Sequence, residues 1–231
     1  TNGLYKVLDR IKAKYPNLPM MLCAGGGGRT DYAFLKYFTE FWASDNTDPY
    51  NRVFIQGGFS QFFPALSICN HVTSWGNQSI KFKTDVAMMG KLGFDINVKE
   101  LKEKELKYTQ DAVANYKRLS TVICQGDMYR LISPYDESRA VLMYVNEAKS
   151  KAVLFSYTLH PLYDPQYNSV RFQGLEPSKT YKVEEINVIP EGKKSLEESG
   201  ESFTGDFLMS VGLRVSSSKV ESSVVLEITE I

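Results

Sequence analysis

The sequence predicts an α/β module followed by an all-β module, and three observations lead to this prediction. Helix and strand signals alternate through the first half of the 231 residues. Short strand-like runs separated by Gly, Pro, Asp and Ser fill the second half. The composition, with 43% hydrophobic and 23% charged residues, is that of a folded globular protein. We place the boundary near Gly126, which divides the chain into modules at 1–126 and 127–231.

The first module is expected to hold four β/α units. The spacing of Leu4, Leu8 and Ile11 predicts an amphipathic helix at 4–15. Asp48-Pro49 marks a helix start, because Asp is a good N-cap and Pro is favoured at the first helical position. The other expected elements are strands at 19–23, 39–44, 71–75 and within 86–96, a short helix at 31–38, a continuation of the Pro49 helix towards 68, and a long helix from a capping box at Asn97 to about 119.

Four such units are about half of a (β/α)₈ TIM barrel, whose full length is ~250 residues. Half a barrel leaves strand edges unpaired, so we expect the missing N-terminal part of the barrel upstream of Thr1. The strand-like runs of the second module have the spacing of an antiparallel β-sandwich. They lie at 129–132, 140–146, 152–159, 169–172, 180–187, 207–214 and 223–231.

Composition excludes several function classes. Lys+Arg and Asp+Glu are both 27, so the chain lacks the basic excess of a nucleic-acid binder. No apolar run reaches the ~18 residues that span a membrane. Cys23, Cys69 and Cys124 have no disulfide or zinc spacing, and two histidines cannot form a multi-His metal site. The N-terminus has no signal-peptide pattern. The compartment, cytoplasmic or periplasmic/secreted, is left open.

The glycine run at 25–28 follows a predicted strand and admits three interpretations. Bare amides before a helix suit a nucleotide phosphate, but the spacing matches neither the dinucleotide fingerprint nor a P-loop, which makes this interpretation weak. The glycines also suit a tight turn with positive φ. The third interpretation is close approach of the backbone to a neutral ligand, since four side chains are missing at the end of a strand.

Two carboxylates follow the second predicted strand, where the catalytic groups of α/β barrels lie. Asp48 is best explained as the N-cap before Pro49. Asp45 has no capping duty and is free to point into the barrel mouth. Trp42 could stack on a sugar, although a core position is the commoner explanation for a Trp.

Two boxes together carry a specific family resemblance. Cys-Ala-Gly-Gly-Gly-Gly-Arg-Thr-Asp at 23–31 and Trp-Ala-Ser-Asp-Asn-Thr-Asp at 42–48 resemble the α-galactosidases (melibiases) of glycoside hydrolase family 36. Further similar stretches cover nearly the whole chain, at 69–72, 77–78, 85–95, 125–131 and 205–212.

The resemblance implies a retaining exo-α-galactosidase that acts on raffinose- or melibiose-type oligosaccharides. Such enzymes use a nucleophile and a general acid/base, and they need no cofactor or metal. The family's acid/base falls on Asp45. Its galactose contacts fall on Cys23 and Gly25, whose small size leaves room for the sugar, and Trp42 lines the same pocket.

The chain departs from the family pattern in three places. The nucleophile lies in a Lys-Trp-Asp type motif on an earlier strand, and no such motif precedes Cys23, so we expect the isolated chain to be inactive. Lys83-Thr84-Asp85 has a similar shape but follows the acid/base. Trp75-Gly76 replaces a Val-Pro pair, and the stretch from Asn77 to Asp85 is shorter, so the substrate-entry rim is expected to differ.

Alternatives remain within and outside this family. The same motifs suit an α-N-acetylgalactosaminidase or a galactosyl-transferring relative such as raffinose synthase, although Cys23 favours a plain 2-hydroxyl. A non-catalytic sugar-binding fragment is the alternative from another class. Whether the protein is a homo-oligomer is left open.

Overall fold

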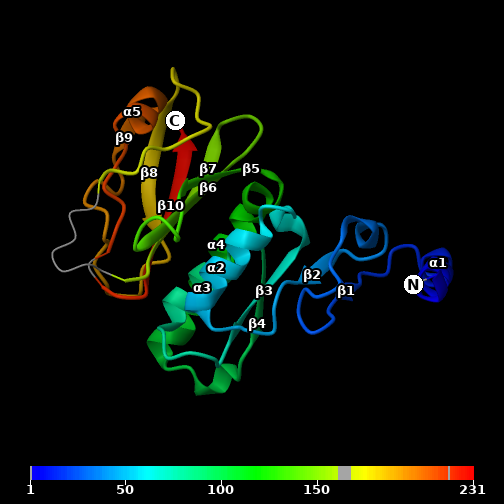
Figure 1. The fold of residues 1–231 in the computed structure, drawn as a ribbon. Coiled ribbons are helices and arrows are strands. Elements are labelled where there is room, and N and C mark those ends of the chain that lie inside the picture. Colours follow the sequence, from blue (N-terminus) through cyan, green and yellow to red (C-terminus); the bar gives the residue numbers. More distant parts are fainter. Residues whose placement is uncertain (1, 161–167, 218) are drawn as a thin grey trace.

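The computed structural model describes residues 2–160, 168–217 and 219–231, and contains two sheets (Figure 1). A parallel sheet holds β1 (Met21–Leu22), β2 (Glu40–Trp42), β3 (Ile68–Thr73) and β4 (Lys91–Asp95) in that order. Adjacent strands pair in parallel, so their carboxyl ends meet at one edge. The α/β character of the first half is therefore confirmed.

The helices of the first half have clear local causes. They are α1 (Asn2–Lys14), α2 (Pro49–Phe59), α3 (Ile80–Ala87) and α4 (Glu103–Gln125). Asp48 caps α2 as predicted, and the helix passes through Gly57 and Gly58 before ending at Phe59. Short 3-10 helices are η1 (Tyr32–Lys36), η2 (Ala65–Ser67) and η3 (Val98–Glu100). Asn97 caps η3, so the prediction that it opens the long helix is wrong; the N-cap of α4 is Lys102, five residues later.

The second half forms a six-stranded sheet in the order β5-β6-β7-β10-β8-β9, with antiparallel pairing throughout. Its strands are β5 (Asp127–Ile132), β6 (Arg139–Val145), β7 (Lys151–Thr158), β8 (Thr180–Ile186), β9 (Ser202–Thr204) and β10 (Ser222–Glu230). The prediction of a strand at 207–214 is wrong, because Thr204 caps the helix α5 (Gly205–Ser210) there. The run at 169–172 makes only an isolated bridge, Val170 to Leu213. The structure thus describes one antiparallel sheet where we expected two packed sheets.

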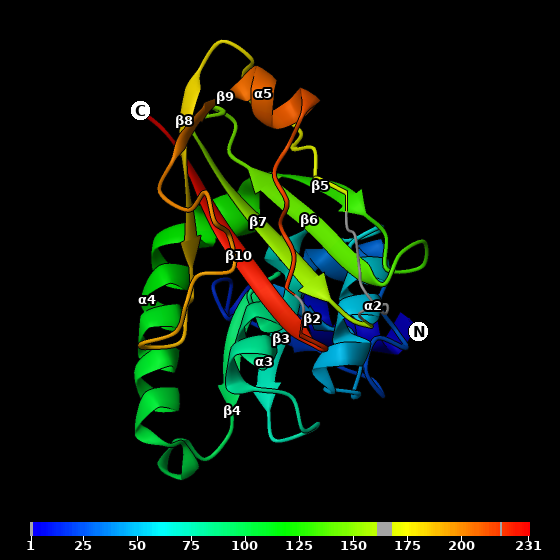
Figure 2. The ribbon, with the colours of Figure 1, turned by 90° about the vertical axis from the view of Figure 1, so that its left-hand side faces the viewer.

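A layer of helices lies between the two sheets (Figure 1). Side chains of α2, α3 and α4 such as Val53, Phe82 and Leu119 pack against one face of the antiparallel sheet. The other face packs against α5 and the segments around it, and in Figure 2 this sheet faces the viewer. Every residue of β6 is buried for this reason, since both of its faces are covered. The cluster between the helices and the antiparallel sheet therefore holds the two modules together.

No helix in the described part of the chain is long and apolar enough to cross a membrane. In the described residues, no cluster of three or more His, Cys, Asp and Glu side chains could hold a metal ion.

Candidate active site

The glycine loop packs against the segment that follows β2. Gly25 and Gly26 have φ values of 60° and 72°, a conformation that favours glycine. A Cβ on Gly26 would lie 2.7 Å from Ser44 Cα, and one on Gly27 would lie 2.8 Å from the Ala43 carbonyl oxygen. The bare backbone therefore lets this loop reach the segment that carries Asp45.

Gly25 differs from the two glycines after it, because a Cβ there would meet no atom within 4 Å. Its left-handed backbone thus borders open space, as a position that leaves room for a ligand would. The loop leads into η1, and the Asp31 carboxylate accepts a hydrogen bond from the Phe34 amide at that helix start. This capping argues against a phosphate at the start of η1.

Asp45 lies with two of the other predicted site residues. Its Oδ1 accepts a hydrogen bond from Trp42 Nε1 at 3.1 Å, and Cys23 Sγ lies 3.9 Å from the same oxygen. Asp45 and Cys23 are exposed, whereas Trp42 is partly buried. The ends of β1 and β2 thus bring a thiol, an indole and a carboxylate to one point of the strand-end edge.

Arg52 supports this group from α2, and sequence reasoning missed it. Its Nη2 donates to the Ser44 carbonyl oxygen at 2.6 Å and its Nε donates to the Asn46 carbonyl oxygen at 2.8 Å. These carbonyls flank Asp45, so Arg52 sets the backbone that presents the carboxylate. The guanidinium also lies 4.5 Å from the Trp42 ring centroid. Burial lowers the pKa of Arg52 to about 10, which still leaves it charged at neutral pH.

Asp48 has the capping role that the sequence suggested. Its Oδ1 accepts hydrogen bonds from the Asn51 backbone amide at 3.0 Å and from Asn51 Nδ2 at 3.2 Å. Gln78 Nε2 donates to its other oxygen at 3.4 Å. Three donors thus occupy this carboxylate, which leaves Asp45 as the acid available on this loop.

His71 of β3 extends the site, and it was not predicted either. Its ring centroid lies 4.9 Å from that of Trp42, and its Nε2 lies 3.3 Å from Cys69 Sγ. Gly93 of β4 makes room for it, because a Cβ there would lie 2.4 Å from the imidazole. Burial lowers the pKa of His71, so the ring is neutral at pH 7 and packs against the Trp42 indole.

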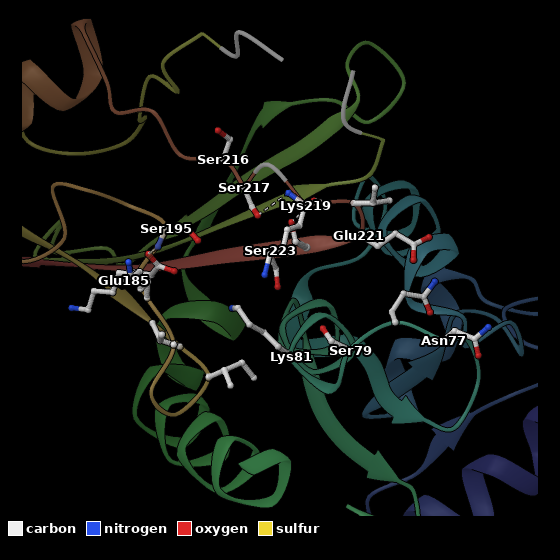
Figure 3. Close-up of a pocket in the computed structure, with 18 residues that line it drawn as sticks. Asn77, Ser79, Lys81, Glu185, Ser195, Ser216, Ser217, Lys219, Glu221 and Ser223 are labelled. Atoms are coloured by element: carbon white, nitrogen blue, oxygen red, sulfur yellow. Dashed lines mark hydrogen bonds between the residues drawn. The ribbon is translucent and has the colours of Figure 1, made fainter. Parts of the chain in front are cut away.

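A large cavity lies elsewhere, at the junction of the two modules (Figure 3). Its volume is about 930 Å³, and it is lined by the start of α3, the β8–β9 connection and the segment entering β10. Lys81, Lys219, Glu185 and several serines face it. None of the predicted site residues lines it, so the size of this cavity does not identify the site.

Comparison with known proteins decides the family. The sequence model of the melibiase family matches residues 1–126, and that of the glycosyl hydrolase family 36 C-terminal domain matches residues 139–228. The chain belongs to glycoside hydrolase family 36. It is 32% identical over 221 residues to the probable α-galactosidase G of Emericella nidulans, covering 93% of this chain and 28% of that protein. It is 32% identical over 192 residues to α-galactosidase AgaA of Geobacillus stearothermophilus, covering 80% of this chain and 26% of that one.

Solved structures of the family have the same fold. The family 36 α-galactosidase AgaB of Geobacillus stearothermophilus has a TM-score of 0.88 at 28% identity, covering 99% of this chain and 31% of that structure. The structure of AgaA from the same organism in complex with raffinose has a TM-score of 0.89 at 27% identity, with the same coverage of 99% and 31%. This family 36 chain therefore spans about a third or less of the relatives that it matches.

Proposed function

We propose that this family 36 chain carries the general acid/base of a retaining α-galactosidase, and that Asp45 is this residue. The observation that carries the proposal is the exposed Asp45 carboxylate at the end of β2, held by Trp42 Nε1 and bordered by Cys23. The names of the relatives and the raffinose complex support galactosides as substrates.

In the proposed reaction Asp45 acts twice. It first donates its proton to the glycosidic oxygen as the leaving group departs and a second carboxylate attacks the anomeric carbon. It then removes a proton from water, which hydrolyses the glycosyl-enzyme intermediate and restores the acid. Cys23, Gly25 and Trp42 surround the galactose in this proposal, and their small or flat surfaces leave space for the ring.

The nucleophile is proposed to come from outside residues 1–231. A retaining pair of carboxyl groups lies ~5–5.5 Å apart. The family's nucleophile lies in a Lys-Trp-Asp type motif on a strand before the glycine loop, and no such motif precedes Cys23. Glu40 is at the opposite end of β2 and pairs with Lys91 Nζ at 3.0 Å. Glu40 therefore does not suit the role, and we propose that the nucleophile lies on an earlier strand outside residues 1–231.

We extend this proposal to the architecture. Residues 1–126 form the second half of the catalytic (β/α)₈ barrel, and residues 127–231 form a C-terminal β-domain without catalytic residues. Two findings support this architecture. Among the described residues, β1 and β4 are edge strands of the parallel sheet. The relatives are also more than three times as long as the part of them that this chain covers. Exposed Leu4 and Val7 of α1 and exposed Met21 of β1 would then face the first half of the barrel.

The full-length protein tests this proposal in one set of assays. We expect it to hydrolyse raffinose and melibiose, with the α-anomer of galactose released first in proton NMR spectra. We expect α-N-acetylgalactosaminides to be poor substrates, and residues 1–231 alone to release no galactose. Release of the β-anomer would refute the retaining mechanism. Turnover by residues 1–231 alone that is lost with Asp45→Asn would show that the nucleophile lies within this chain.

Thiol alkylation of the full-length enzyme gives an independent prediction. Cys23 is exposed, Cys69 is buried and Cys124 is half-buried. Burial raises the pKa of the Cys69 thiol to about 11 and also raises the pKa of Cys124, so both are poor nucleophiles at neutral pH. Iodoacetamide should therefore modify Cys23 first and inactivate the enzyme. Galactose at ten times its Kd should slow the inactivation about tenfold by mass action.

Cys23→Ala is the matched control, and its residual activity should resist iodoacetamide. Mass spectrometry of the inactivated enzyme identifies the alkylated thiol. Inactivation at an equal rate with and without galactose would show that Cys23 does not border the sugar.

A further inference from the structure

We propose that Trp75 is a specificity-determining residue, whose indole is the surface on which the leaving-group sugar of an α-galactoside stacks. This inference rests on the proposed function. It concerns a position at which the sequence departs from the family pattern of Val-Pro, and it assigns the role to a residue outside the galactose pocket.

The turn at 73–76 lies directly against the loop of the proposed acid. It follows β3, the neighbour of β2 in the parallel sheet. Thr73 Oγ1 donates a hydrogen bond to Thr47 Oγ1 at 2.8 Å. A Cβ on Gly76 would lie 2.7 Å from Asp48 Oδ2. Thr73 and Gly76 lie on either side of Trp75 in the sequence, and they contact Thr47 and Asp48. The turn that carries Trp75 therefore lies against the loop that carries Asp45.

The turn is held in place by several hydrogen bonds. Thr73 Oγ1 accepts a hydrogen bond from the Trp75 amide at 3.2 Å. Lys83 Nζ donates to the Thr73 carbonyl oxygen at 3.3 Å and to the Gly76 carbonyl oxygen at 2.9 Å. Gly76 has a φ of 74°, which a Pro or Val would not tolerate. A fixed turn presents its side chain at low entropic cost, which favours binding.

The indole at this fixed position is exposed. Trp75 is 56% exposed, and it takes part in none of the aromatic, cation–π or core contacts found among residues 2–160, 168–217 and 219–231. Trp42, by contrast, is engaged by Arg52, His71 and Asp45. A large apolar ring in water gains free energy when another apolar surface covers it. The C–H face of a pyranose is such a surface, and its hydroxyl groups remain in water.

The position of Trp75 relative to Asp45 assigns it to the leaving group. Cys23, which follows β1, lies 3.9 Å from Asp45 Oδ1, and the turn that carries Trp75 lies at the end of β3, on the other side of β2. The acid protonates the oxygen that joins the two sugars. If galactose occupies the β1 side of this oxygen, then the ring on the β3 side is the sugar that departs.

The test compares substrates with and without a leaving-group sugar in the full-length enzyme. Trp75→Ala should lower kcat/KM for raffinose about tenfold, the range of a single stacking contact. For methyl α-galactoside, whose leaving group is methanol, kcat/KM of Trp75→Ala should stay within about twofold of the wild-type value. Trp75→Tyr should recover most of the raffinose activity. Inhibition by the product sucrose should weaken in Trp75→Ala by a factor similar to the loss on raffinose.

Tyr135→Ala is the matched control, because Tyr135 is 76% exposed but lies in the other module, next to Phe54. Tyr135→Ala should leave kcat/KM unchanged for both substrates. An equal loss on both substrates in Trp75→Ala, or no loss on raffinose, would overturn the inference. If the wild type cleaves no α-galactoside, the proposed function fails instead. In that case saturation-transfer NMR with sucrose still tests Trp75. The saturation-transfer signals of sucrose should be present with wild type and Tyr135→Ala and lost with Trp75→Ala.

Discussion

Asp45→Asn in the full-length enzyme should reduce raffinose hydrolysis by ~10²–10⁴-fold, the usual contribution of general acid–base catalysis. An amide cannot donate the proton that a departing sugar needs. A nitrophenolate barely needs one, so the first step with nitrophenyl α-galactoside should be far less impaired. Hydrolysis of the intermediate should also slow, because Asp45 is proposed to activate the water. Kinetics on both substrates and mass spectrometry of a trapped galactosyl-enzyme measure these effects.

Asp48→Asn is the matched control for this experiment. Asn is nearly as good an N-cap as Asp and can still accept the hydrogen bond from the Asn51 amide. Its loss of activity should be small and equal for both leaving groups. If Asp48→Asn shows the leaving-group dependence while Asp45→Asn cleaves raffinose, then the acid/base assignment is wrong and the two residues exchange roles.

Asp85→Ala should be the most destabilising single substitution among those considered, by about 3–5 kcal/mol. The Asp85 side chain is fully buried, and it accepts four hydrogen bonds. The donors are Lys81 Nζ at 2.6 Å, Tyr108 OH at 2.9 Å, Asn187 Nδ2 at 2.7 Å and Ser223 Oγ at 2.6 Å. Lys81 and Tyr108 belong to the α/β module, whereas Asn187 directly follows β8 and Ser223 lies in β10 of the second module. Removing the carboxylate leaves these groups unpaired at the junction of the modules.

The chain offers a matched control in Asp111→Ala. Lys107–Asp111 has the same i,i+4 spacing and the same 2.6 Å distance as Lys81–Asp85, but its side chains are 60% and 51% exposed. Exposed helical pairs contribute only about 0.3–0.5 kcal/mol. In thermal unfolding of the full-length variants, Asp85→Ala should therefore have a clearly lower midpoint temperature than Asp111→Ala. Equal midpoints would show that Asp85 does not hold the modules together.

The fold could be read from the sequence where local signals were strong. Asp48-Pro49 began α2, and the β-branched and aromatic runs of β6, β7, β8 and β10 lie within one or two residues of their predicted ranges. Two helices were missed. In α3 the polar Thr84 and Asp85 are buried together with four apolar residues, so the polar residues do not mark an exposed helix face. In α5 the Thr204 cap outweighs the apolar run that resembled a strand.

The candidate site was predictable in part for a similar reason. Asp45, Cys23 and Trp42 stand in compact motifs that follow predicted strands, and the structure brings these three together. Arg52 and His71 lie in ordinary-looking helix and strand segments. Their contribution depends on which face of α2 and β3 meets Trp42, and no local pattern encodes that face.

The sequence by itself determined the α/β-then-β order, the resemblance to family 36 and the role of Asp48 as the cap of α2. These follow from local chemistry: capping, turn residues and motif spacing within a few positions of the chain. Only the tertiary structure decided that Arg52 holds both carbonyls beside Asp45, that Asp85 joins the modules and that the turn carrying Trp75 contacts the acid's loop. The physical reason is that each of these contacts joins separate segments, and strand pairing and core packing set their distances after the chain has folded.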